Sequence, residues 1–279
     1  MVSSGMPKTD GSRATDLWLG RIGANEPLPP RERQAIERAL SHGQWHKAGE
    51  TMVREGADET FAVLVLDGIA ARTKETPTGE RRILSILLPG DLCSAGLGLV
   101  LPVDYNLVAL SDCCVGRISA AQIVSLQAAN PGLMLRLVRT LAEDAAVTRE
   151  WVAGLGRGTG LARTGRLLCE LVWRLRAVGL ANGPSTTIPI RQTDIADAVG
   201  LSCVQVNRLL KGFERSGLIR IARGSITILD EARLATLCEF DPGYLARRRT
   251  PMSALAWSGL HVDRPGSLYH FKERPPDTL

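Results

Sequence analysis

The pattern of hydrophobic and polar positions changes character along the 279-residue chain. Between Trp45 and Ser119, short β-prone runs such as residues 61–66 and 83–88 alternate with glycine-containing turns, a rhythm typical of an all-β sandwich or barrel. Beyond Pro131 the spacing of apolar residues becomes helical. The sequence therefore predicts an α+β fold, with a β domain followed by helices. The turns lie at Gly49-Glu50, Asp67-Gly68, Thr78-Gly79 and Pro89-Gly90-Asp91.

The first predicted long helix, over residues 131–158, carries a heptad stripe. Its apolar or small residues recur alternately at four and three positions, and the charged residues fall off the stripe. Two copies of the chain can pair along it as a coiled coil, or the helix can pack on its own β domain. The stripe consists of Met134, Val138, Leu141, Ala145, Thr148, Val152 and Leu155. Four glycines at its end, Gly154, Gly156, Gly158 and Gly160, predict a hinge.

Five regions follow from these patterns. Residues 1–15 are predicted to be a disordered part of an N-terminal arm, and a short helix is expected to begin at Pro30. A second helix is predicted over residues 162–178, followed by a strand at 187–190. The last segment is rich in Arg and Pro and is predicted to be a loosely ordered tail. The regions are an arm (1–27), the β domain (28–130), the heptad helix and hinge (131–158), a helical domain (159–240) and the tail (241–279).

Two short helices joined by a glycine turn are predicted within residues 192–215. Thr193 is expected to cap the first helix and Gly200 to end it. Ser202 and Gln205 form a Ser-x-x-Gln capping box for the second helix. Its core stripe is Val206, Leu209, Leu210 and Phe213, and the helix ends before Gly217.

The outer face of the second helix has the chemistry of a DNA-reading surface. Arg208 can pair with guanine, Asn207 or Gln205 with adenine, and Val204 with a thymine methyl group. A predicted hairpin with Arg223 at its tip resembles the wing of a winged helix. Residues 158–230 hold 10 Lys/Arg and only 5 Asp/Glu, while residues 1–157 hold 17 and 18. The candidate DNA-binding residues are Gln192, Thr193, Ser202, Cys203, Val204, Gln205, Asn207, Arg208, Lys211 and Arg223.

Composition argues against several other classes. No apolar run is long enough for a membrane span and the first residues lack a secretory signal, so we expect a cytoplasmic protein. The six cysteines are scattered, without metal-binding spacing. His42 and His46 are four apart, but Gly43 argues against a helical metal site, and a structural role is expected for both. No nucleophile–base arrangement indicates an enzyme, and no cofactor is expected.

The segment from Gly200 to Leu210 and the residues Ser216-Gly217-Leu218-Ile219 resemble the Crp/Fnr, or cyclic AMP receptor protein, family of bacterial regulators. The resemblance runs from about Leu28 to Leu245. It implies an effector-type β-roll of jelly-roll form, a dimerisation helix and a C-terminal winged helix-turn-helix. It also implies a homodimer on an inverted-repeat operator and contact with RNA polymerase. The glutamate common among its best-known members is Val204 here, which implies a different operator.

The resemblance also bears on the effector. Members that bind a cyclic nucleotide hold its phosphate with an Arg-Ser or Arg-Thr pair and a Phe-Gly-Glu turn. The matching stretches here are Val103-Asp104 and Leu92-Cys93-Ser94, and an aspartate repels a phosphate. Control by cyclic nucleotide is therefore not expected. The first cysteine is Cys93, which disfavours an N-terminal iron-sulfur cluster.

Two classes of function remain open on these grounds. The first is a sequence-specific transcription regulator. The second is a sensory or scaffold protein whose helical pair only packs in a core. Cys203 lies on the first turn of the reading helix, where oxidation would place bulk or charge against DNA. Redox control through Cys203 is a hypothesis, with a cysteine that the site merely tolerates as the alternative.

Overall fold

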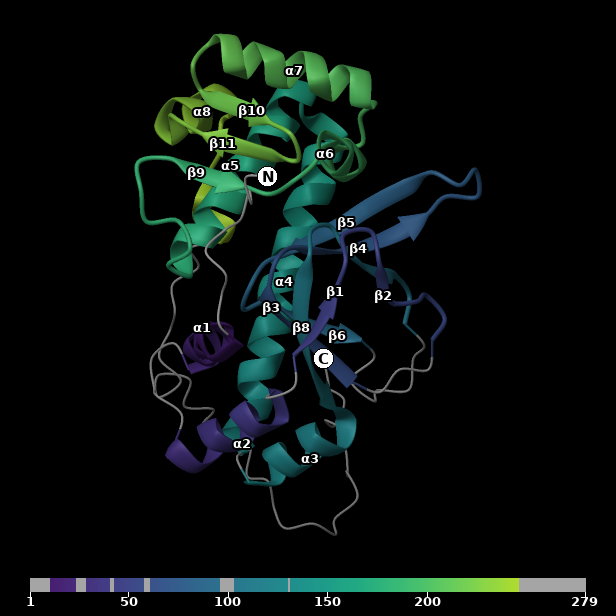
Figure 1. Ribbon diagram of the computed structural model, residues 1–279, viewed down its shortest axis with the longest axis vertical. Coiled ribbons are helices and arrows are strands. Elements are labelled where there is room, and N and C mark those ends of the chain that lie inside the picture. The colour runs from purple at the N-terminus through teal and green to yellow at the C-terminus, as the bar shows by residue number, and fades with distance from the viewer. Residues whose placement is uncertain are drawn as a thin grey trace, which may run out of the picture.

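The computed structural model describes residues 11–23, 29–40, 43–57, 61–95, 103–129 and 131–245 (Figure 1). Its fold is α+β, as predicted, with an N-terminal β-roll and a C-terminal winged helix. The β-roll has two four-stranded antiparallel sheets, ordered β1-β8-β3-β6 and β2-β7-β4-β5. Its strands are β1 (Gln44–His46), β2 (Thr51–Val53), β3 (Phe61–Asp67), β4 (Ala70–Glu75), β5 (Arg81–Leu87), β6 (Leu92–Ala95), β7 (Asn106–Ala109) and β8 (Cys113–Ser119).

Gly68 shows why a turn predicted from the sequence contains glycine. It joins β3 to β4 with φ of +78°, and a Cβ atom there would lie 2.1 Å from the carbonyl oxygen of Asp112. A side chain would both strain the backbone and collide with the connection between β7 and β8. The turn is therefore accessible only to glycine.

A helix near the N-terminus corrects one prediction. Residues 11–15 were expected to be disordered, but they begin α1 (Gly11–Gly23). Trp18 and Leu19 are buried in a cluster with residues of the β-roll, and Leu17 packs on the cluster that includes the winged-helix core. Arg13 donates from Nη2 to the carbonyl oxygen of Gly179 at 3.0 Å. Contacts far along the chain order this segment, which is why its local composition was misleading.

Four further helices flank the β-roll: the first precedes it in the chain, and the other three lead from it to the winged helix. They are α2 (Pro30–Leu40), α3 (Ala120–Ala129), α4 (Pro131–Arg157) and α5 (Gly160–Ala177). Figure 1 shows α4 as the long helix that extends from α3 toward the winged helix.

The predicted glycine hinge is wrong for its first two members. Gly154 and Gly156 lie inside α4, and only Gly158 and Thr159 separate α4 from α5. Packing of the neighbouring Trp151 against the core offsets the helix propensity that glycine loses, which is about 1 kcal/mol per residue. Thr159 then caps α5 by accepting a hydrogen bond from the Ala162 N–H at 3.1 Å.

The winged helix comprises α6 (Gln192–Val199), α7 (Cys203–Arg215), α8 (Glu231–Cys238) and a three-stranded sheet. The sheet has the order β10-β11-β9, formed by β10 (Ile219–Ala222), β11 (Ser225–Ile228) and β9 (Thr186–Ile188). A 3-10 helix, η1 (Pro242–Tyr244), follows α8. The predicted loose tail is therefore wrong for residues 241–245, because Tyr244 packs against Glu170; residues 246–279 lie outside the described residues.

The β-roll and the winged helix share one apolar core. A single cluster of buried side chains includes Ile83, Ile86 and Leu88 from the β-roll together with Leu168 and Leu171 from α5. The two domains are thus packed directly against each other, in addition to being connected along the chain. Within the described residues, no helix is long and apolar enough to cross a membrane.

Candidate nucleic-acid interface

The start of α7 is fixed by a complete capping box. The Ser202 hydroxyl accepts a hydrogen bond from the Gln205 N–H at 3.3 Å, and the Gln205 Oε1 accepts one from the Ser202 N–H at 3.0 Å. Gly200, in the left-handed conformation with φ of 65°, ends α6 just before it. These features agree with the sequence prediction. They set the direction of α7 independently of any ligand.

The predicted cap at Thr193 is wrong. The N-cap of α6 is Arg191, which makes no side-chain capping bond, and Thr193 is the second residue of the helix. Contacts of the first turn explain the earlier start. Gln192 bonds to α7 and Asp194 pairs with a strand of the β-roll, so tertiary contacts determine where α6 begins.

One face of α7 packs in the core and the opposite face is open. Val206, Leu210 and Phe213 are buried, and Leu209 is half-buried. On the open face Cys203, Arg208 and Lys211 are exposed, and Val204 is 80% exposed. Figure 1 shows α7 at the edge of the molecule farthest from α2 and α3. A helix presented in this way fits the width of the major groove.

The two amide side chains proposed for base recognition, Gln205 and Asn207, already make hydrogen bonds within the protein. The Gln205 oxygen belongs to the capping box. Asn207 is half-buried and donates from Nδ2 to the Oε1 of Gln192 at 2.7 Å. The structure therefore brings Gln192 and Asn207 together, a contact between α6 and α7 that the sequence did not reveal.

The wing is the hairpin of β10 and β11. Ala222 pairs with Ser225, so Arg223 and Gly224 form its two-residue turn, and Gly224 has φ of +75°. The Glu214 carboxylate accepts the Ile221 N–H at 2.8 Å and attaches the wing to α7. Among the residues that the structure describes, Arg208, Lys211 and Arg223 have no ion-pair partner. Their charges are available for phosphate or guanine.

Arg81 links the β-roll directly to the helix-turn-helix, a contact that sequence reasoning missed. From β5 it donates to Asp194 at 2.5 Å and to Asp197 at 2.7 Å, both on α6. The Asp194 side chain is 4% exposed and that of Arg81 is 32% exposed. One signal was present in the sequence. Asp194 and Asp197 lie on a helix expected near DNA, where two carboxylates would repel phosphates unless a cation paired with them.

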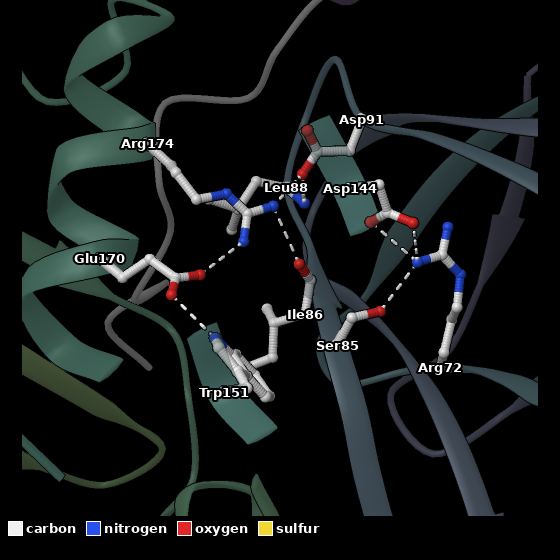
Figure 2. Close-up of polar contacts among 9 residues, drawn as sticks. All are labelled: Arg72, Ser85, Ile86, Leu88, Asp91, Asp144, Trp151, Glu170 and Arg174. Carbon is white, nitrogen blue, oxygen red and sulfur yellow. Dashed lines mark hydrogen bonds and ion pairs between the residues drawn. The ribbon is translucent and has the colours of Figure 1, made fainter. Parts of the chain in front are cut away.

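A second polar contact joins the domains deeper inside (Figure 2). Arg174 of α5 pairs with Asp91 of the β-roll, bonds to Glu170 at 3.1 Å, and donates to the carbonyl oxygen of Ile86 at 3.0 Å. Burial alone lowers the pKa of Arg174, but the carboxylates of Asp91 and Glu170 outweigh that effect and raise it. The guanidinium therefore stays charged in this buried position.

Glu170 also receives two neutral donors. The Trp151 Nε1–H donates to its Oε2 at 2.8 Å and the Tyr244 hydroxyl at 2.7 Å. Burial raises the pKa of Tyr244 and the Glu170 charge raises it further, so the phenol keeps the proton that it donates. Both oxygens of this buried carboxylate are thus satisfied by α4, α5 and η1.

The interior of the β-roll contains a separate charged pair. Arg72 on β4 is buried and donates from Nη1 to Asp144 of α4 at 2.7 and 2.9 Å and to Ser85 at 3.0 Å (Figure 2). Its guanidinium lies 5.4 Å from the ring centroid of Tyr105. The stretches matched to a phosphate grip offer no cation: Val103, Leu92 and Cys93 are buried and apolar, and Asp104 is exposed.

The cysteine and histidine side chains that the structure describes are buried, apart from Cys203. Among the described residues, no group of three or more potential ligands is arranged to hold a metal. His46 is buried with Nδ1 2.7 Å from Glu50, and His42 lies outside the described residues. Cys203 is exposed and the other five cysteines are buried. Burial raises the pKa of Cys169 to about 12 and that of Cys238 to about 11, so these thiols stay protonated.

Two known protein families match the chain, one in the β-roll and one in the winged helix. Residues 44–130 match the model of the cyclic nucleotide-binding domain, and residues 162–237 match that of the Crp-like helix-turn-helix domain. The Nitrogen fixation regulation protein FixK of Bradyrhizobium diazoefficiens is 30% identical over 233 residues, covering 83% of this chain and 96% of that protein. The Transcriptional activator protein FnrL of Cereibacter sphaeroides is 28% identical, covering 73% and 83%.

The fold agrees with these relatives. The structure of FixK2 from Bradyrhizobium japonicum superposes with a TM-score of 0.63 at 21% identity, covering 70% of this chain and 96% of that one. The chain therefore belongs to the Crp/Fnr family of transcription regulators. Its winged helix is a DNA-binding domain, and the protein is a DNA-binding transcription regulator.

The buried junction gives a first prediction. Replacing Arg174→Met leaves Asp91 and Glu170 buried without this cation, so the free energy of unfolding should fall by about 3–5 kcal/mol. The control is Arg176→Met: that arginine pairs with Glu231 at 2.5 Å, but its side chain is 47% exposed, and a change under about 1 kcal/mol is expected. Urea unfolding followed by tryptophan fluorescence measures both. Equal losses in the two variants would contradict the role assigned to Arg174.

Proposed function

We propose that the protein binds an inverted-repeat operator as a homodimer, with α7 of each copy in the major groove. The observation that carries this proposal is the open face of α7, which presents exposed side chains to solvent. The capping box at the start of α7 fixes the direction in which that helix runs. In this arrangement Arg208 contacts guanine and Val204 contacts a thymine methyl group. Lys211, Arg223 and Thr193 lie toward the phosphates, and Ser202 holds the start of α7 through its capping box. Regulation proceeds by binding rather than by catalysis.

The division between base and phosphate contacts can be tested with single variants. Arg208→Ala should weaken a specific site by about 1–3 kcal/mol and relax the preference at one base position. Arg223→Ala should lower the affinity for all sequences and reduce its dependence on salt. The measurement is selection from a random DNA pool followed by titration of the selected and random DNA. If Arg208→Ala loses the same affinity for selected DNA as for random DNA, Arg208 does not read a base.

The heptad stripe of α4 supports the homodimer. Within the chain Val138, Val152 and Leu155 remain 50%, 63% and 51% exposed. Ala145 and Thr148 are also exposed, Leu141 is half-buried, and the Met134 side chain lies outside the described residues. A helix that packed only on its own β domain would bury these positions. A two-fold pairing along the stripe would place two copies of α7 about one helical turn of DNA apart.

A charge on the stripe should separate the two copies. Val152→Glu places two carboxylates at the pairing face, whereas Ala153→Glu adds the same charge at an exposed position off the stripe. Multi-angle light scattering should give the mass of two chains for the wild type and for Ala153→Glu, and a lower average mass for Val152→Glu. A wild-type mass of one chain in the presence of DNA would contradict the dimer.

The β-roll supports a regulator that does not respond to a cyclic nucleotide. The interior guanidinium of Arg72 is already neutralised by Asp144, and Asp104 would repel a phosphate at the matched position. The protein is inferred to act in the cytoplasm, where it would meet both DNA and RNA polymerase. The polymerase contact rests on membership of the family.

Thiol chemistry offers a second candidate function. Cys203 is the one exposed cysteine of the six and lies on the first turn of α7, so oxidation there would put a charged group against the DNA. Peroxide should reduce operator affinity in the wild type and leave Cys203→Ser unaffected, as measured by fluorescence anisotropy before and after treatment. An equal loss in both proteins would exclude Cys203 as the redox site.

A further inference from the structure

The contact between Gln192 and Asn207 joins the first turn of α6 to the open face of α7. Asn207 donates from Nδ2 to Oε1 of Gln192 at 2.7 Å, and the contact is partly buried. Asn207 lies three residues after Val204 and directly before Arg208, so it belongs to the same outer face. The partner of its amide is thus supplied by the other helix of the pair.

This contact decides which polar groups remain for a ligand. A primary amide has one acceptor oxygen and two N–H donors. Asn207 uses one N–H, so it keeps its oxygen and the second N–H. Gln192 uses its oxygen on Asn207, so it keeps two donors. The two side chains, chemically alike before folding, therefore offer different groups to DNA.

The remaining groups match two parts of a DNA duplex. An acceptor together with a donor is what pairing with N6 and N7 of adenine requires, and Asn207 retains both. Donors alone suit a phosphate oxygen, and Gln192 retains its donors. Gln205 is less suited to adenine, because its oxygen accepts two hydrogen bonds within the capping box.

We propose that Gln192 is a positioning residue for base recognition, which holds the amide of Asn207 in the one orientation that reads adenine. The bond turns the nitrogen of Asn207 toward α6 and its oxygen away from Gln192. Without that bond the amide rotates freely, and its two ends exchange places. This inference rests on the proposed function, in which α7 occupies the major groove.

The test removes one hydrogen-bond acceptor of the DNA at a time. The wild type first selects its site from a random pool, and each adenine of that site is then replaced by 7-deazaadenine, which lacks the N7 acceptor. The position of interest is the one where this replacement lowers the DNA affinity of the wild type by roughly tenfold but leaves the DNA affinity of Asn207→Ala unchanged. The ratio of affinities for the two DNAs at that position is the readout.

Two substitutions at Gln192 separate positioning from packing. Gln192→Ala removes the acceptor, so the ratio should fall from roughly ten to near one. Gln192→Glu keeps an acceptor for Asn207, so the ratio should persist, while its negative charge lowers the affinity for all DNA. Asn182→Ala is the control, because it removes an exposed amide outside the helix-turn-helix, one that donates to the carbonyl oxygen of Gly179; it should keep the wild-type ratio. Circular dichroism checks that each variant is folded.

The outcomes distinguish this inference from the proposed function. A wild-type ratio in Gln192→Ala overturns the positioning role, as does an Asn207→Ala protein that keeps the wild-type ratio at every adenine. Loss of the ratio in Gln192→Glu as well would show that the amide of Gln192 acts in its own right, and would also overturn it. A wild type that binds selected and random DNA equally would overturn the proposed function itself.

Discussion

The buried guanidinium of Arg174 fixes how the two halves of the chain lie relative to each other. It extends from α5 of the winged-helix region to Asp91 and the Ile86 carbonyl of the β-roll, and it pairs with Glu170, which in turn binds Trp151 of α4. A charge in this position is tolerated only while all its partners are in place. The shared apolar core and the Arg81 contact therefore depend on the relative position of the two domains that Arg174 specifies.

The parts of the fold that could be predicted from the sequence are those with local causes. The capping box of Ser202 and Gln205, the left-handed Gly200 and the two-residue turn at Arg223 and Gly224 each depend on residues within a few positions of one another. The alternation of short β-prone runs with glycine turns likewise indicated the β-roll. Such signals are strong because the backbone conformation they require is accessible to few residue types.

The parts that could not be predicted depend on partners distant in sequence. Arg81 meets Asp194 from 113 positions away, and nothing in either segment identifies the other. Residues 11–15 were expected to be disordered, but they belong to a helix that is held by distant contacts, such as the packing of Trp18 on the β-roll. Asn207 was expected on the outer face of α7; it is half-buried there, and its bond to Gln192 depends on how the two helices cross.

The openness of α7 bears on how the specificity of this protein can change over generations. Val204, Cys203 and Arg208 are exposed and contribute almost nothing to the core, so substitutions there cost little in folding. Under the proposed DNA contacts, the same substitutions would change the sequence that is bound. Gln205 forms part of a helix cap and Asn207 bonds to the neighbouring helix, so a change at either position also alters the structure. Under the proposed contacts, these three exposed positions are where a new operator can be acquired at the least cost in stability, whereas the amide residues are constrained by the fold.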